Sequence, residues 1–453
     1  MSSIETFLSL LGDIPVQTVP ALVKRKSRDF YWYSPVLKRQ LDSCFADCIV
    51  MPRNEEDLLK IASAARETKT RLTPRGGGTG NYGQAVPMEG GAVIEMTELN
   101  KLLWVKDGVA RVQAGMNMLD LDRALQEQGW EVRMYPSTKR TATIGGFIAG
   151  GSGGIGSVRW GGLSSPGNVL ALRLMTLGKE PEVVELRGED ARSVLHTYGT
   201  TGLITELEIG VEPVVNWQDM AVSFASFEEA AVFARDIALQ SGIQKKLVSV
   251  VDGDLPPFFA SVREHVPEGA SLVILMIAPA GIETVKLLAT KAGGKLCYEA
   301  NTREMEDTSG ATPLYELTWN HTTLQVLKKD RGYTYLQCGY PADGTLDKVV
   351  EIRVLFPDEL MMHLEFFPMG GHVSCAALPV IRFTDEDRLN HIIAEHEKRG
   401  VNIANPHVVT IEEGGMHRVA SPDLAAIKKR YDPLLLLNPG KMLSARTLEP
   451  QDL

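Results

Sequence analysis

The sequence lacks three features that would each indicate a class of function. It has no basic excess: 47 Lys and Arg against 57 Asp and Glu give a formal net charge of −10. This balance argues against a general nucleic-acid binder, which needs a positive surface to displace counterions from phosphates. Its longest apolar run, residues 271–278, is too short to span a bilayer and predicts a buried strand. The beginning, MSSIETFLSLLGDIP, has an early Glu5 and no basic stretch, so no secretory signal is expected.

Cysteine is also scarce. The five cysteines include no C-x-x-C pair, and Cys44 and Cys48 stand four positions apart without companions. Zinc and iron–sulfur sites need several closely spaced ligands, so neither is expected. A reducing cytoplasm is the expected compartment.

The sequence does contain an unusual density of glycine in residues 72–84, LTPRGGGTGNYGQ, in which residues 78–83 spell G-x-G-x-x-G. A Rossmann site requires a helix directly after the glycines, but Pro87 and a glycine pair follow here, and then a β-like segment at 92–96. A second match at 151–156 continues into an equally non-helical pattern. Both matches are therefore rejected as Rossmann sites. Two interpretations of residues 72–84 remain: a loop whose amides surround an anion, with Arg75 at its edge, or a loop exposed to solvent.

Three further segments share this character. Residues 141–156 are small, hydroxylated and nearly uncharged, residues 198–210 are a turn leading into an alternating strand, and residues 431–442 end in Asn-Pro-Gly-Lys-Met. Such a composition lets a large planar group lie against the backbone while hydroxyls and amides meet its polar edge. At 453 residues, with 44% hydrophobic and 23% charged residues, the chain is expected to fold into two or three globular domains.

Four motifs in this order, R-G-G-G-T-G from Arg75, T-I-G-G from Thr143, G-L-I-T from Gly202 and N-P-G-K from Asn438, resemble the vanillyl-alcohol oxidase (PCMH-type) superfamily of FAD-dependent oxidoreductases. The similarity is greatest to the glycolate oxidase and D-lactate dehydrogenase branch of FAD-linked oxidases. The resemblance implies an α+β flavoprotein with a two-subdomain FAD-binding domain and a cap whose antiparallel sheet is covered by helices. The expected divisions are an N-terminal arm at 1–41, the FAD domain at 42–215, the cap at 216–420 and a returning segment at 421–453.

The resemblance also implies which residues contact FAD. Many family members attach FAD through a histidine after the arginine–glycine run or a cysteine before T-I-G-G. Thr79 and Lys139 occupy these positions here, so the resemblance implies non-covalent FAD. The implied cofactor-binding residues are Pro74, Arg75, Gly76, Gly77, Gly78, Thr79, Gly80, Gly83, Gln84, Pro136, Ser137, Thr141, Thr143, Ile144, Gly145, Gly146, Ala149, Gly150, Gly151, Gly154, Ser157, Gly202, Ile204, Asn438 and Lys441.

The base that removes the substrate proton is expected among the cap histidines, because imidazole titrates near neutral pH. His372 is the first candidate, followed by His321, with His417 and His363 as further members and His407 in the same group. Possible carboxylate clamps are Arg331, Arg382 and Arg418. Relatives that act on D-2-hydroxyacids carry a metal on a glycine–histidine stretch and a later E-H-G-x-G. Here residues 413–416 lack the second histidine, so no metal is expected.

The leading hypothesis is an FAD-dependent oxidoreductase that oxidises a small acidic alcohol of the 2-hydroxyacid type by hydride transfer to flavin N5. Two alternatives stay open: an aromatic or sugar alcohol oxidase of the same superfamily, and a catalytically silent FAD-binding subunit of an electron-transfer complex. The expected partners are a small-molecule substrate and an unidentified electron acceptor. No nucleic acid and no membrane span are expected, and a homodimer or an oxidase-complex subunit are the assemblies left open.

Overall fold

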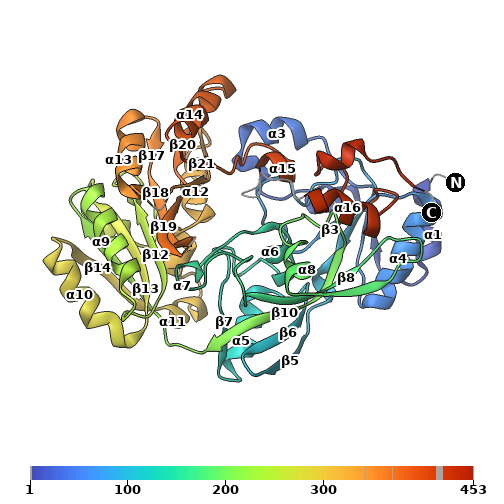
Figure 1. The fold of residues 1–453 in the computed structure, drawn as a ribbon, viewed down its shortest axis with the longest axis horizontal. Coiled ribbons are helices and arrows are strands. Elements are labelled where there is room, and N and C mark those ends of the chain that lie inside the picture. Colours follow the sequence, from blue (N-terminus) through green and yellow to red (C-terminus); the bar gives the residue numbers. More distant parts are fainter. Residues whose placement is uncertain (1–2, 342, 370, 415–421, 452–453) are drawn as a thin grey trace.

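The computed structural model describes residues 3–341, 343–369, 371–414 and 422–451. Two sheets and both chain ends form one half of the molecule, and a larger sheet with its helices forms the other (Figure 1). No described helix combines the length and apolar character needed to cross a membrane.

The first sheet has the order β1-β2-β4-β3, in which β2, β4 and β3 run parallel. Its strands are Val16–Gln17 (β1), Cys48–Val50 (β2), Leu72–Arg75 (β3) and Ala92–Glu95 (β4). Helix α4 (Glu55–Thr68) crosses from β2 to β3 and is capped by Asn54, whose side chain accepts a hydrogen bond from Asp57 N at 2.8 Å. Strand β3 therefore delivers Arg75 and the glycine loop at the carboxyl end of a parallel pair.

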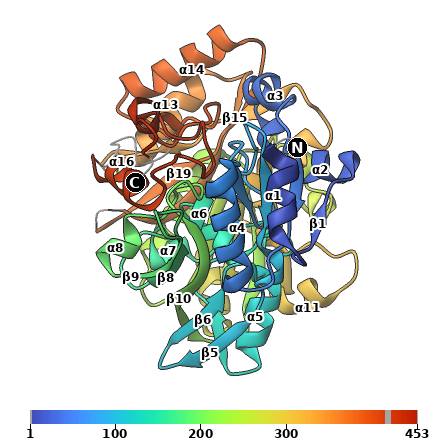
Figure 2. The ribbon, with the colours of Figure 1, turned by 90° about the vertical axis from the view of Figure 1, so that its right-hand side faces the viewer.

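The N-terminal residues are packed onto this half. Helix α1 (Ser3–Leu11) lies along α4 (Figure 2) and buries Phe7 and Leu11 in the core around the first sheet. The aromatic turn η1 (Tyr31–Tyr33) buries Tyr31 and Tyr33. Helices α2 (Pro20–Lys26) and α3 (Pro35–Leu41) complete the segment.

The second sheet is antiparallel, in the order β5-β6-β10-β8-β9, with β7 also paired to β10. The strands are Leu102–Lys106 (β5), Val109–Gln113 (β6), Trp130–Val132 (β7), Val169–Met175 (β8), Val183–Arg187 (β9) and Leu203–Pro213 (β10). The helices of this region are α5 (Met118–Gln126), α6 (Ile144–Gly150), α7 (Ser157–Trp160) and α8 (Glu189–Arg192). The prediction that no helix follows Gly156 is wrong by one turn, since α7 is helical and ends at Trp160, directly before Gly161.

The third sheet confirms the expected cap architecture. Its order is β14-β11-β13-β12-β18-β19-β16-β21, and every pairing in it is antiparallel. The strands are Gln218–Phe224 (β11), Lys245–Val251 (β12), Ser271–Ile277 (β13), Lys295–Asn301 (β14), Cys338–Gly339 (β16), His363–Met369 (β18), His372–Ala377 (β19) and Asn402–Ile403 (β21). A smaller sheet joins Tyr333–Tyr335 (β15), Val380–Arg382 (β20) and Leu360–Met361 (β17).

Alternate residues along the cap strands pack into two different hydrophobic cores. Met220, Val222 and Phe224 of β11 pack with the helices α9 (Phe227–Leu239), α10 (Ile282–Lys291), α13 (Thr345–Leu355) and α14 (Glu386–Lys398), which cover one face of the sheet (Figure 1). Ala221, between them, joins the core shared with the second sheet. Because successive strand residues point to opposite faces, a single strand contributes side chains to both of these cores. The remaining cap helices are α11 (Thr302–Asp307), α12 (Asn320–Leu327) and α15 (Ile411–Gly414).

The C-terminal segment returns to the first half of the molecule. After α16 (Pro422–Tyr431), the chain runs beside β3: Leu72 N donates to Leu436 O at 2.9 Å and Asn438 N donates to Leu72 O at 2.7 Å. A segment more than 350 positions away thus extends the first sheet next to the glycine loop.

Candidate cofactor pocket

A single large pocket collects the predicted glycine-rich segments. The space free of protein atoms, counted together with the open mouth, is about 1730 Å³. One wall comes from the first half of the molecule and the other from the cap. The predicted residues that line it are Pro74, Arg75, Gly76, Gly77, Gly78, Thr79, Gly80, Gln84, Pro136, Ser137, Thr143, Gly145, Gly146, Ala149, Gly150, Gly151, Ser157, Gly202 and Ile204.

The first two glycine-rich segments meet backbone to backbone. A Cβ added to Gly76 would overlap the Thr143 hydroxyl, and one added to Gly77 would overlap the Thr141 carbonyl oxygen. Gly78, with φ +65°, lies against the Arg75 guanidinium. Only glycine permits these approaches, which leave peptide amides rather than side chains at the pocket surface. Two surfaces distant along the chain therefore meet at one pocket.

Helix α6 forms the floor of this contact and was not anticipated from the sequence. Thr143 caps it by accepting a hydrogen bond from Gly146 N at 3.2 Å. A Cβ on Gly145 would collide with Ala114, so α6 packs tightly on the second sheet. Ile144 points into the core, and neither it, Thr141 nor Gly154 is among the lining residues.

The returning segment stands behind the pocket wall instead of lining it. Asn438 Nδ2 donates to the carbonyl oxygens of Gln84 at 2.8 Å and Tyr198 at 2.7 Å, and Lys441 Nζ donates to that of Gly83 at 2.6 Å. Burial lowers the pKa of Lys441 to about 7. These two side chains fix the loop after the glycines and the turn before Gly202 in one arrangement.

The N-terminal segment supplies a pocket residue that sequence reasoning missed. Asp29 lines the pocket, and its carboxylate accepts hydrogen bonds from Tyr31 N at 2.9 Å and Ala85 N at 3.2 Å. Burial raises the pKa of Asp29 despite these donors. The neighbouring Arg28 carbonyl accepts from Arg75 Nη1 at 2.6 Å. No motif marks Asp29, because its role arises only when the arm folds over the glycine loop.

The cap wall consists of aromatic, small and amide side chains. Trp319, Asn320, Gln337, Cys338, Phe367 and residues 376–378 line it. Trp319 has φ +52°, a strained value for a bulky residue. Its backbone N donates to Glu365 Oε1 at 2.7 Å, and Glu365 in turn pairs with His363 Nε2 at 2.8 Å. A buried polar group on β18 thus holds a pocket aromatic in place.

None of the predicted catalytic histidines that the structure describes lies among the lining residues. His372 is exposed at the start of β19, and His363 is fully buried behind Trp319. His321, on α12, has a pKa lowered to about 4 by burial. His407 uses both ring nitrogens, toward Ser34 Oγ at 2.7 Å and the Tyr335 carbonyl at 2.9 Å. His417 lies outside the described residues, so a histidine base stays a prediction.

The proposed clamps are likewise distant from the pocket lining. Arg331 stacks over Trp32 and Arg382 over Tyr333, while Arg418 falls outside the described residues. Within the described part of the chain, no group of three or more His, Cys, Asp and Glu side chains is placed to hold a metal ion.

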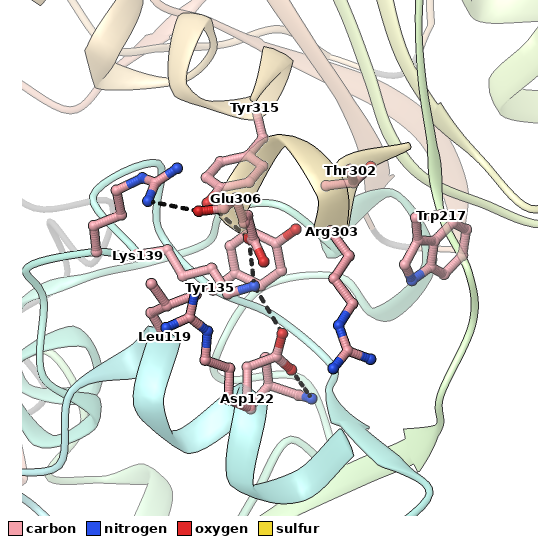
Figure 3. A network of polar contacts seen from close by, with 12 residues as sticks. Leu119, Asp122, Tyr135, Lys139, Trp217, Thr302, Arg303, Glu306 and Tyr315 are labelled. Atoms are coloured by element: carbon pink, nitrogen blue, oxygen red, sulfur yellow. Dashed lines mark hydrogen bonds and ion pairs between the residues drawn. The ribbon is translucent and has the colours of Figure 1, made fainter. Parts of the chain in front are cut away.

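Lys139 is not among the pocket lining residues and lies in a buried network (Figure 3). Its Nζ contacts Asp122 Oδ2 at 2.7 Å and Glu306 Oε1 at 2.8 Å, and all three side chains are at most 5% exposed. Burial opposes the charged ammonium, but the two carboxylates outweigh it and raise the pKa of Lys139. Asp122 lies on α5 and Glu306 on cap helix α11, so the network ties the two halves together directly behind pocket residues 136–138.

His196 and Tyr198 were also missed. Tyr198 lines the pocket and its hydroxyl lies 3.4 Å from His196 Nε2. Both residues have positive φ, +56° and +54°. The signal that could have found them is a titratable pair directly before the G-T-T-G turn.

The pocket fits FAD in its backbone-lined first wall, where glycines leave peptide groups open to a large ligand. Comparison with known proteins agrees. Residues 46–186 match a family model described as an FAD binding domain. The glycolate oxidase subunit GlcD of Bacillus subtilis (strain 168) is 23% identical over 426 residues, covering 88% of this chain and 89% of that protein.

Other relatives share only part of their length with this chain. The mitochondrial D-lactate dehydrogenase [cytochrome] of Arabidopsis thaliana is 29% identical over 219 residues, 46% of this chain and 37% of that protein.

A solved structure of alkyldihydroxyacetonephosphate synthase superposes with a TM-score of 0.72 at 18% identity, covering 96% of this chain and 85% of that one. At this identity the structural match supports the fold alone.

Proposed function

We propose that this chain, which belongs to the FAD-linked oxidase family and is an FAD-dependent oxidoreductase, oxidises a small acidic alcohol of the 2-hydroxyacid type, with FAD held non-covalently. Bound FAD would accept the hydride at N5. The observation that carries the proposal is the closure of Gly76 and Gly77 on Thr143 and Thr141, which leaves a backbone-lined wall facing the cap. The near full-length similarity to a glycolate oxidase subunit supports the hydroxyacid class.

The chain's residues would divide the work. The amides of residues 76–80, next to the Arg75 guanidinium, suit a pyrophosphate, because successive glycine N–H groups can converge on an anion. Residues 145–151 would lie against the ring system, and the cap wall would position the substrate. Trp319 and Phe367 would exclude water from the reacting carbon, which strengthens electrostatic interactions inside the pocket.

The cap wall favours a second candidate, a neutral alcohol. Its described lining combines aromatic and small side chains with the Asn320 and Gln337 amides, which can form hydrogen bonds with hydroxyl or carbonyl groups of a neutral substrate. Such a wall suits an aromatic or sugar alcohol, the alternative raised by the sequence.

Anaerobic reduction of the bound flavin by paired substrates tests both candidates. Each pair keeps the carbon skeleton and exchanges a carboxylate for a hydroxymethyl group: D-lactate with propane-1,2-diol, and glycolate with ethylene glycol. Bleaching by the acids alone would support the hydroxyacid class, and bleaching by neutral alcohols, including benzylic and sugar alcohols, would support the second. If a yellow protein is bleached by none of them, the catalytically silent subunit is favoured.

A further inference from the structure

We propose that Tyr198 and His196 form the proton relay of the pocket: Tyr198 Oη accepts the proton of the substrate hydroxyl while passing its own proton to His196 Nε2. This inference rests on the proposed alcohol oxidation and names the groups that would remove the proton. Both residues belong to the segment 196–199, which lies directly before the predicted flavin contact at Gly202.

The hydrogen bonds define the direction of the relay. His196 Nδ1 lies 2.9 Å from the carbonyl oxygen of Gly151, which can only accept, so Nδ1 carries the proton in the neutral ring. Nε2 is then an acceptor and faces the Tyr198 hydroxyl at 3.4 Å, with the two rings edge to face at 5.1 Å. This contact is long, as catalytic hydrogen bonds often are before a ligand tightens them. Gly151 also lines the pocket, so the relay begins and ends on its wall.

The backbone is strained to build this pair. His196 and Tyr198 have φ values of +56° and +54°, a region that bulky residues avoid. Three hydrogen bonds hold them there: His196 N to Ile148 O at 3.1 Å, Tyr198 N to Ala149 O at 2.9 Å, and Asn438 Nδ2 to Tyr198 O at 2.7 Å. Strain maintained by specific contacts is a frequent property of reacting groups.

The chemistry requires a relay and not an isolated tyrosinate. Burial raises the pKa of Tyr198 well above its usual value, so the phenol is protonated at neutral pH and can accept a proton only as it donates one. In the balanced step the substrate C–H hydrogen leaves with its electron pair for FAD and the carbinol becomes a carbonyl. The hydroxyl proton bonds to Tyr198 Oη, the phenol O–H bond breaks, and its proton forms the His196 imidazolium.

The other titratable lining residues are less suited to this role. Among the described ones, Asp29 accepts two backbone N–H groups, Arg75 is a guanidinium, and burial raises the pKa of Cys338. Tyr82 is the remaining phenol, and its hydroxyl forms hydrogen bonds with the side chains of Gln337 and Tyr335. Tyr198 alone among them combines exposure to the pocket with a histidine acceptor.

Two variants with matched controls test the relay. Tyr198→Phe removes the hydroxyl and keeps the ring, and His196→Asn keeps a donor toward Gly151 and a residue type that tolerates positive φ. The controls are Tyr333→Phe and His391→Asn, which make the same chemical changes outside the pocket. The holoprotein is mixed anaerobically with the alcohol that bleaches the wild-type flavin best, and the reduction rate and the substrate Kd are measured separately.

We expect both relay variants to lower the reduction rate by about 10²–10⁴-fold with little change in substrate Kd, and the controls to match the wild type. The affinity of apoprotein for FAD, followed by flavin fluorescence, should stay within about threefold of the wild type in Tyr198→Phe. ¹⁵N spectra of histidine-labelled protein, with the His196 signal assigned by its loss in His196→Asn, should show an Nε2 acceptor resonance that moves in Tyr198→Phe.

The relay is overturned if Tyr198→Phe is reduced at the wild-type rate, or if its His196 resonance does not move. It is also overturned if FAD affinity falls in proportion to the rate, which would indicate a structural role. In these cases the wild type still bleaches and the proposed function stands. A wild-type flavin that no alcohol bleaches would instead contradict the proposed function itself, and the relay with it.

Discussion

Lys139→Met isolates the energetic role of the buried network that joins the two halves. Lys139, Asp122 and Glu306 are 3%, 4% and 5% exposed, so solvent screens their interaction little. Removing the ammonium leaves two carboxylates buried without their cation, a change that typically costs about 3–5 kcal/mol. If the half containing residues 42–215 unfolds as one unit, this corresponds to a fall in Tm of about 6–20 °C.

The assay is thermal unfolding of the holoprotein followed by circular dichroism, with Lys101→Met, an exposed lysine, as the matched control. The triple variant Lys139→Met/Asp122→Asn/Glu306→Gln carries no unpaired charge and should recover a large part of the loss. In the wild type Lys139 lowers the pKa of Asp122 against the effect of burial. Without Lys139 burial raises that pKa, so the stability deficit should shrink as pH falls from 7 toward 5, where the carboxyl takes up a proton.

Two results would refute this reasoning. One is a Lys139→Met variant whose Tm lies within 2 °C of the Lys101→Met control. The other is a triple variant no more stable than the single one, which would mean that lost packing and not unpaired charge causes the deficit.

Three further predictions concern the cofactor and the base. Gly77→Ala should abolish FAD binding, because the added Cβ would overlap the Thr141 carbonyl oxygen. The control Gly242→Ala, in which nothing lies within 4 Å of the added atom, should bind FAD like the wild type. Equal FAD affinities of the two variants in a fluorescence titration would contradict the packing argument. Heat denaturation should release the flavin into the supernatant, since Thr79 and Lys139 offer no attachment group, and a yellow pellet would indicate a covalent link. The sequence ranks His372 first as the base, whereas the proposed relay assigns the proton to Tyr198: if His372 is the base, His372→Ala should slow flavin reduction by about 10²–10⁴-fold, and an unchanged rate would remove it from that role in favour of the relay.

Motifs in the sequence indicated the cofactor and the class of fold through their resemblance to a family of FAD-dependent oxidoreductases. The motifs around Arg75, Thr143 and Gly202 are local backbone requirements: a glycine that must approach another chain is specified by its own position, so it can be recognised before the fold is known. The helix cap at Asn54 and the alternation along β11 are local in the same way.

Only the tertiary structure decided which side chains reach the pocket. A side chain's neighbours depend on segments far away in the chain. The sequence could therefore rank five cap histidines only by their local surroundings, and the four that the structure describes are not among the pocket lining residues. Contacts with distant residues place three side chains at the pocket: Asp29 with Ala85, 56 positions away, Tyr198 with Ala149, 49 positions away, and Trp319 with Glu365, 46 positions away. Lys139, read from sequence as a missing attachment point, turned out to be the buried cation between the halves, because burial and its two carboxylates are properties of the assembled fold.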